Sequence, residues 1–499
     1  MNINTCFIFH ECINLIWPLF EVIRCIKYQI FIGPNWTRKG IVKLNTPVFR
    51  RKISTNRPRL PKKIHTFDAF QSVAYRYFWA SVATFSGSFW LEQVVMGWLA
   101  YQITNSALLT SIAMGLGAMP ILLGAPLGGL ISERFKKKPL LMGIYAYQTT
   151  LVIIFAALVM TDNASTWTIF AYIFLMGMIW TIHDPTRMSL LTSIIPRKSI
   201  LNAMALNSLA FSIMRLVMPA LGGLLLAYVG PGPLFIGQAL LILCTALTVL
   251  LMKNNERTEK QLDNKTFQHV IPELKKGIEH IAQQPVIVVL LILNILMMVS
   301  IVPFISGLMP VYAAEVFYVG PKGLGLLISG AGFGSLIGTT ILASVGNIKN
   351  PIRIAFLIIG IMALLMLCIT FIDSYPLALT FIMVFSGLLM CYFSIASSTV
   401  QGILEDRFRG RVTGIYMMAT GLMPLGSLIA GSIANTLGAQ FATGVGAASS
   451  LIALVIIVIA FRPLWHFTNE IDSPSPEPLD EINKPQPSIS TIPATVNES

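Results

Sequence analysis

Twelve long apolar stretches dominate this 499-residue chain and leave few folds open to it. Each is long enough to cross a lipid bilayer as a helix, which takes about 20 mainly apolar residues. A strand edge inside hydrocarbon would leave backbone groups unpaired, so helices are expected. Only 11% of the residues are charged, against about 25% in a typical soluble domain. We therefore predict an all-α membrane protein with spans at roughly 77–101, 107–131, 139–160, 166–185, 202–228, 233–252, 285–308, 323–346, 352–372, 377–400, 412–436 and 440–461.

One long polar interruption, beginning at Lys253, divides these stretches into six and six. A proline–glycine pattern recurs at matching places, as Pro219 with Gly222 and Gly223 in the fifth stretch and Pro424 with Gly426 in the eleventh. We predict two pseudo-symmetric six-helix bundles, at 66–252 and 285–462, joined by a cytoplasmic loop at 253–284. The alternative is that proline and glycine recur because both are common in membrane helices.

Basic residues gather in alternate loops between the expected spans. Cytoplasmic loops of membrane proteins carry an excess of Lys and Arg, so these loops are expected on the cytoplasmic side. With an even number of spans, both termini then lie in the cytoplasm. The loop residues concerned are Arg134, Lys136, Lys137, Lys138, Arg187, Arg197, Lys198, Lys349, Arg353, Arg407, Arg409 and Arg411, with six more between 253 and 276.

The two ends of the chain differ in composition from its body. Residues 1–65 hold twelve of the 35 Lys and Arg residues and two acidic residues, so the basic character belongs to one end and no nucleic-acid partner is indicated. We expect this segment to be a poorly ordered basic extension, with attraction to an anionic membrane surface as the alternative. The Pro- and Ser-rich segment 463–499 is expected to be a disordered cytoplasmic tail.

Two ionisable residues fall deep inside expected spans. Glu92 lies 15 residues into the first span and Arg215 lies 14 residues into the fifth, depths of about 22 and 21 Å at 1.5 Å per residue. Charges at this depth are costly and therefore usually functional. We hypothesise that Glu92 and Arg215 interact and that Glu92 is a proton-binding carboxylate. The alternative is a structural pair that never titrates.

Several polar residues in the expected spans could contact a transported molecule. We name Gln93, Asn294, Tyr392 and Ser394, each with a helix-packing role as the alternative. Trp90, Trp98, Trp180, Phe304 and scattered methionines could add an adaptable apolar pocket, with lipid-facing or interfacial-belt positions as the alternative. His183, beside Asp184, could relay protons near neutral pH or could simply be solvated. The chain has no phosphate-binding Gly-x-x-x-x-Gly-Lys-Ser/Thr loop and no metalloprotease or nucleophile motif, so we expect no cofactor, no metal and no enzymatic activity.

Short motifs in the chain are similar to those of one transporter superfamily. They are Gly-Trp-Leu-Ala-Tyr-Gln-Ile-Thr at 97–104, Gly-Gly-Leu-Ile-Ser-Glu-Arg-Phe-Lys-Lys-Lys at 128–138, Asp-Pro-Thr-Arg at 184–187 and Arg-Gly-Arg-Val at 409–412. With these motifs, residues 66 to 462 resemble the major facilitator superfamily. The likeness is to its twelve-span branch of enterobactin exporters, macrolide-type efflux pumps and transmembrane secretion effectors.

The resemblance implies a cytoplasmic gate in the loop after the second span. Glu133 stands where the family usually has Asp, and it keeps the charge on a longer arm. The alternative is that the basic residues of this loop only fix topology. The residues that the resemblance assigns to the gate are Glu133, Arg134, Asp184 and Arg187, with Arg407 and Arg411 as counterparts in the second half.

The resemblance further implies alternating-access transport of a small molecule. We expect a monomeric, proton-coupled exporter of an amphipathic or hydrophobic molecule in the bacterial inner membrane. The family's antiporter motif, Gly-x-x-x-Gly-Pro-x-x-Gly-Gly, keeps Pro219, Gly222 and Gly223 here but has Met214 and Met218 in place of its first two glycines. Siderophore export is the first alternative, and an importer or a non-transporting membrane sensor is the next.

Overall fold

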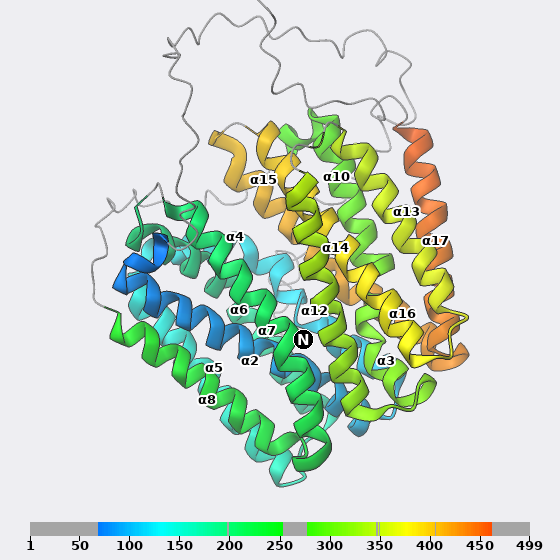
Figure 1. Cartoon of the computed structure of the whole chain (residues 1–499), viewed down its shortest axis with the longest axis horizontal. Coiled ribbons are helices and arrows are strands. Elements are labelled where there is room, and N and C mark those ends of the chain that lie inside the picture. The colour runs from blue at the N-terminus through cyan, green and yellow to red at the C-terminus, as the bar shows by residue number, and fades with distance from the viewer. Residues whose placement is uncertain are drawn as a thin grey trace, which may run out of the picture.

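The computed structural model describes residues 68–196, 199–252, 277–345, 348, 350–404 and 406–461, and every regular element in this part is helical (Figure 1). The expectations for 1–65, for 253–276 of the central loop and for 463–499 lie outside the described residues. We call residues 68–252 the N-terminal half and residues 277–461 the C-terminal half. Figure 1 shows most helices of the N-terminal half on one side of the molecule, while α3 (Ala107–Leu116) of that half lies beside α16 (Met423–Leu437) of the other.

The N-terminal half contains the first six expected spans. Ser72 begins the long first helix by accepting a hydrogen bond from the Tyr75 backbone, which satisfies a donor that the helix itself leaves unpaired. The second span breaks into two helices near Gly117. The elements are η2 (Asp68–Gln71), α2 (Val73–Thr104), α3 (Ala107–Leu116), α4 (Met119–Arg134), α5 (Lys137–Met160), α6 (Thr166–Ile194), α7 (Ile200–Val229) and α8 (Pro231–Leu251).

The C-terminal half contains the remaining six spans. Its first span changes from α-helix to wider π-helical turns beside Pro303 and Pro310. A proline removes a backbone donor, so such irregular turns are expected there. The elements are α10 (Pro285–Leu296), η5 (Met297–Ile301), η6 (Pro303–Gly307), α11 (Met309–Val311), η7 (Tyr312–Val316), α12 (Gly320–Val345), α13 (Pro351–Ile369), α14 (Tyr375–Ile403), α15 (Asp406–Met418), η8 (Ala419–Leu422), α16 (Met423–Leu437) and α17 (Ala439–Ala460).

Ten helical segments of the described residues are long and apolar enough to cross a membrane. The other two expected spans correspond to α2, which is long but carries more polar and aromatic residues, and to the broken pair α3 and α4. The outward surface agrees with a lipid environment, because one stripe of α8 exposes an unbroken row of large apolar side chains. This row is Ile236, Leu240, Leu243, Leu247 and Leu250.

The same arrangement appears twice in the contacts between the halves. The fifth span, α7, packs on α12, the eighth, while the eleventh span, α16, packs on α3, part of the second. The links that follow α7 and α16 are also alike, since each is a single glycine with positive φ, Gly230 (74°) and Gly438 (89°). These matched contacts and turns support the pseudo-symmetry that the proline–glycine pattern predicted.

The helices of both halves run between two ends of the molecule, and the loops at one of these ends are rich in basic residues. We call the end at which Arg134 and Lys136 lie the basic end, and the end at which Tyr101 lies the opposite end. At the opposite end, the Tyr101 hydroxyl donates to Glu315 Oε1 over 2.9 Å, and Ser106 Oγ donates to Asn435 Oδ1 over 2.9 Å. These hydrogen bonds hold the two halves together at that end.

Candidate transport site

Glu92 lies inside the N-terminal half, where α2 faces α8 and α6. Its Oε2 accepts a hydrogen bond of 2.8 Å from Gln238 Nε2 of α8. The same amide nitrogen lies 3.2 Å from the hydroxyl of Tyr172, which comes from α6. Along the same two helices, Thr84 and Thr245 are hydrogen-bonded over 2.8 Å. One face of α2 therefore presents a polar row to α8, and the Glu92 carboxylate is held by neutral partners.

Arg215 of α7 faces the other half of the molecule. Its Nη1 donates to Ser335 Oγ of α12 over 2.9 Å, and its guanidinium carbon lies 4.9 Å from the centre of the Trp90 ring. Gly332 of α12 packs directly against the Arg215 backbone and side chain. Arg215 is thus placed where the two halves meet.

The expected contact between Glu92 and Arg215 is not formed in this structure. Arg215 lies over Trp90, which precedes Glu92 by two positions on α2. Two positions on an α-helix turn through about 200°, so Trp90 and Glu92 point in nearly opposite directions. The similar depth of the two charges stays a prediction, and the sequence did not show that Glu92 and Arg215 face different neighbours.

Aromatic rings of the N-terminal half form a continuous group beside Arg215. The ring centres of Phe89 and Trp180 are 4.9 Å apart, those of Phe89 and Trp90 are 5.0 Å apart, and those of Trp90 and Phe211 are 5.5 Å apart. All four side chains are only partly buried. We call Phe89, Trp90, Trp180 and Phe211 the aromatic patch.

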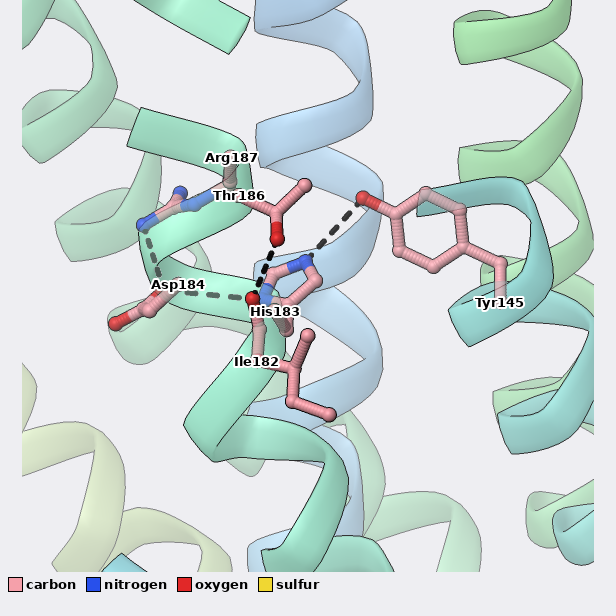
Figure 2. Close-up of polar contacts among 6 residues, drawn as sticks. All are labelled: Tyr145, Ile182, His183, Asp184, Thr186 and Arg187. Carbon is pink, nitrogen blue, oxygen red and sulfur yellow. Dashed lines mark hydrogen bonds and ion pairs between the residues drawn. The ribbon is translucent and has the colours of Figure 1, made fainter. Parts of the chain in front are cut away.

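A second polar group lies farther along α6 towards the basic end (Figure 2). The buried ring of His183 stacks on Phe85 with 4.0 Å between ring centres, and its Nε2 is hydrogen-bonded to the Tyr145 hydroxyl over 3.2 Å. Its Nδ1 lies 3.7 Å from Asp184 Oδ1, which also accepts a hydrogen bond of 3.2 Å from Arg187 Nη2. His183 is therefore an interior residue, and the interfacial, solvated reading of it is wrong.

The residues of the implied gate are only partly visible. Arg134 is exposed at the end of α4, while the side chains of Glu133, Arg407 and Arg411 lie outside the described part. Gly128 of α4 packs on the Thr181 carbonyl of α6. Arg134 and Arg187 each lie six residues beyond this contact, and both helices run towards the basic end. Equal helical rise therefore brings the two arginines to the same level.

The residues predicted to contact substrate fall into two groups. Gln93 is half-buried one turn beyond Phe89, and Ser394 of α14 is exposed. Asn294 and Tyr392 are buried inside the C-terminal half, where Asn294 Nδ2 donates to the Tyr416 carbonyl over 3.1 Å and the Tyr392 hydroxyl donates to the Leu290 carbonyl over 3.4 Å. The structure thus gives Asn294 and Tyr392 contacts that join helices of one half.

The proline–glycine motifs both lie at helix contacts. Gly222 packs on Leu91, and Gly223 approaches the backbone of α12. In the second half, Gly426 packs on the Val299 carbonyl, and the Cα of Pro424 lies against Gly115 of α3.

Sequence reasoning missed several partners of the charged residues. Glu92 is bonded by Gln238, which in turn bonds Tyr172. Arg215 bonds Ser335, and His183 bonds Tyr145. Of these partners, only Gln238 could have been found from the sequence, because it is a polar residue in the middle of a span. Ser335 and the tyrosines are too common in membrane helices to be singled out that way.

The fold has clear counterparts among solved structures. The nucleoside transporter NupG aligns with a TM-score of 0.63 and 12% identity, covering 78% of this chain and 100% of that one. A POT family transporter in complex with a thioalcohol-conjugated peptide aligns with a TM-score of 0.64 and 12% identity, covering 79% and 96%. The chain accordingly has the major facilitator fold, as predicted.

Comparison with protein families narrows this class. Residues 64–488 match the model of the transmembrane secretion effector family, and the chain belongs to that family. It is 24% identical over 370 residues to a staphyloferrin A transporter of Staphylococcus aureus, covering 72% of this chain and 89% of that protein. It is also 23% identical over 351 residues to macrolide efflux protein A of Streptococcus pyogenes, covering 67% and 83%. The predicted family resemblance is confirmed.

Proposed function

We propose that the protein exports an amphipathic small molecule in exchange for protons, by alternating access between its two halves. The observation that carries the proposal is the Glu92 carboxylate of α2, which accepts a hydrogen bond from the neutral amide of Gln238, an amide that also bonds the Tyr172 hydroxyl. Membership of the secretion effector family and similarity to a macrolide efflux protein support the direction of transport.

Glu92 is the proposed proton carrier because its surroundings suit both of its charge states. The amide of Gln238 donates to the carboxylate at 2.8 Å, which supports the ionised form. No cation of the described residues pairs with it, so protonation breaks no ion pair. A carboxyl group with two accessible states can load a proton on one side of the membrane and release it on the other.

The gate is proposed at the basic end. We propose that this end, and both termini, lie in the cytoplasm of a bacterial inner membrane, and the excess of Lys and Arg in the loops there supports this orientation. Arg134, level with Arg187, and the Asp184–Arg187 pair would change partners as the halves move. In the described conformation the opposite end is held by the Tyr101–Glu315 and Ser106–Asn435 hydrogen bonds.

Export is tested by comparing cells that lack and cells that overproduce the protein. The amounts of small molecules and drugs that each strain retains are measured with and without a proton uncoupler. Overproducing cells are expected to retain less of the substrate, and the uncoupler is expected to remove the difference. Equal retention in both strains would reject export, and greater retention in overproducing cells would indicate an importer.

The role of Glu92 is tested by Glu92→Gln, which keeps the size of the side chain and removes its charge. Uptake driven by a pH gradient into inverted vesicles is expected to fall to background, while exchange of substrate without a gradient continues. Asp373→Asn is the matched control, since Asp373 is an exposed carboxylate that also accepts a hydrogen bond from a glutamine amide, Gln440 Nε2 at 3.0 Å, within the C-terminal half. Unchanged proton coupling in Glu92→Gln would remove Glu92 from the mechanism.

Siderophore export is the second candidate function, favoured by the similarity to a staphyloferrin A transporter. It predicts that the deletion strain releases less siderophore under iron limitation. If neither strain alters the distribution of any small molecule, the protein acts instead as a non-transporting sensor.

A further inference from the structure

Arg215 contacts residues of both halves, and no described residue neutralises its positive charge. It donates to Ser335 of the other half and lies over the Trp90 ring. In the described part of the chain no carboxylate pairs with it, and Glu92 faces away towards Gln238. A guanidinium at membrane depth is costly unless it finds a partner. A hydroxyl and a ring face satisfy it only in part, because neither carries a negative charge.

Two hydrogen-bond donors in the same place lack an acceptor. Arg215 Nε and Trp90 Nε1 are both buried and have no hydrogen-bond partner in the structure. An unpaired buried donor costs about 1–3 kcal/mol, so packing alone does not account for two such donors in adjacent side chains. A site with surplus donors and surplus positive charge fits a ligand that supplies acceptor oxygens and negative charge.

The aromatic patch supplies the second half of such a site. Trp90 belongs both to the patch and to the Arg215 contact, so charge and ring surface are continuous. Phe89, Trp180 and Phe211 extend this surface and keep part of their area exposed. Aromatic faces bind flat apolar groups by burial and offset stacking. The group comes from α2, α6 and α7, and Arg215 links it to α12 of the other half.

We propose that this site binds an amphipathic organic anion, with a carboxylate on Arg215 and an apolar ring system on the aromatic patch. The proposal rests on the proposed function, because the bound anion is the exported substrate. Arginine suits this role since its planar fork matches the two oxygens of a carboxylate. Ser335 keeps the guanidinium in place between the halves when no ligand is bound.

The test uses three probes with the same ring and different charge: 2-naphthoate, 2-naphthamide and 2-naphthylmethylammonium. Binding to the purified full chain in detergent is measured by the shift of its thermal midpoint with probe concentration. Wild-type protein is expected to bind 2-naphthoate about tenfold more tightly than 2-naphthamide, the ratio set by one charge-assisted hydrogen bond. The ammonium probe is expected to bind least.

Variants decide whether Arg215 causes this preference. Arg215→Gln is expected to bind 2-naphthoate and 2-naphthamide equally. Lys322→Gln is the matched control, because Lys322 is the exposed counterpart of Arg215, 4.3 Å from the Tyr228 ring at the opposite end. Should Arg215→Gln fail to fold, Arg215→Lys keeps the charge without the fork and is expected to weaken 2-naphthoate binding several-fold.

The proposal is overturned if wild-type protein fails to bind 2-naphthoate or does not prefer it. It is also overturned if the preference survives in Arg215→Gln, disappears in Lys322→Gln or is unaffected in Arg215→Lys. Binding in detergent does not require transport. Anion binding without export in cells would therefore reject the proposed function alone, and export without anion preference would reject this site alone.

Discussion

Gly223 and Gly325 bring α7 and α12 into backbone contact between the halves. A methyl group built on Gly223 would lie 2.5 Å from the Pro321 carbonyl oxygen and 2.8 Å from the Gly325 Cα. Ordinary contacts are about 3.5–4 Å, so in Gly223→Ala the two helices must separate by about 1 Å. Overpacking of this kind costs about 1–3 kcal/mol. If transport separates α7 from α12, the cost falls only on the described conformation, and its population is expected to fall about 5- to 150-fold relative to the other state.

The population of the described conformation is measured by disulfide trapping at the opposite end. Ser106 and Asn435 are hydrogen-bonded over 2.9 Å, so the pair Ser106→Cys and Asn435→Cys is expected to cross-link readily only while the halves are packed there. Adding Gly223→Ala is expected to slow cross-linking. Gly237→Ala in α8 is the control, because its methyl group would meet no atom within 4 Å. Equal cross-linking rates in the two variants would refute the reasoning.

Two further changes test the polar groups inside the N-terminal half. Tyr145→Phe leaves the buried His183 Nε2 without its hydrogen bond and is expected to lower the free energy of unfolding by about 1 kcal/mol, seen as a lower thermal midpoint in detergent; an unchanged midpoint would contradict it. Gln238→Leu removes the hydrogen-bond donor that lies 2.8 Å from Glu92. The ionised form of Glu92 then loses a stabilising contact, so the pH at which transport is half-maximal is expected to rise. The same pH dependence in wild type and variant would show that Gln238 does not tune Glu92.

Much of the fold followed from hydropathy and loop charge. The positions of the spans and the break between the halves depend on local composition, because a bilayer demands long apolar helices whatever their neighbours. The second span was the exception: it consists of α3 and α4, with a break near Gly117. A single glycine in an apolar helix does not reveal such a break, since glycine also serves close helix packing.

The sequence by itself determined how far along their helices Glu92 and Arg215 lie, because this distance depends only on the helical rise counted from the helix end. The tertiary structure decided what each of them meets, since a helix can turn about its own axis without changing that distance. Packing turned Glu92 towards Gln238 within one half and Arg215 towards Ser335 of the other. Packing likewise buried His183, Asn294 and Tyr392. Direction around a helix depends on contacts between distant segments, which local sequence does not encode.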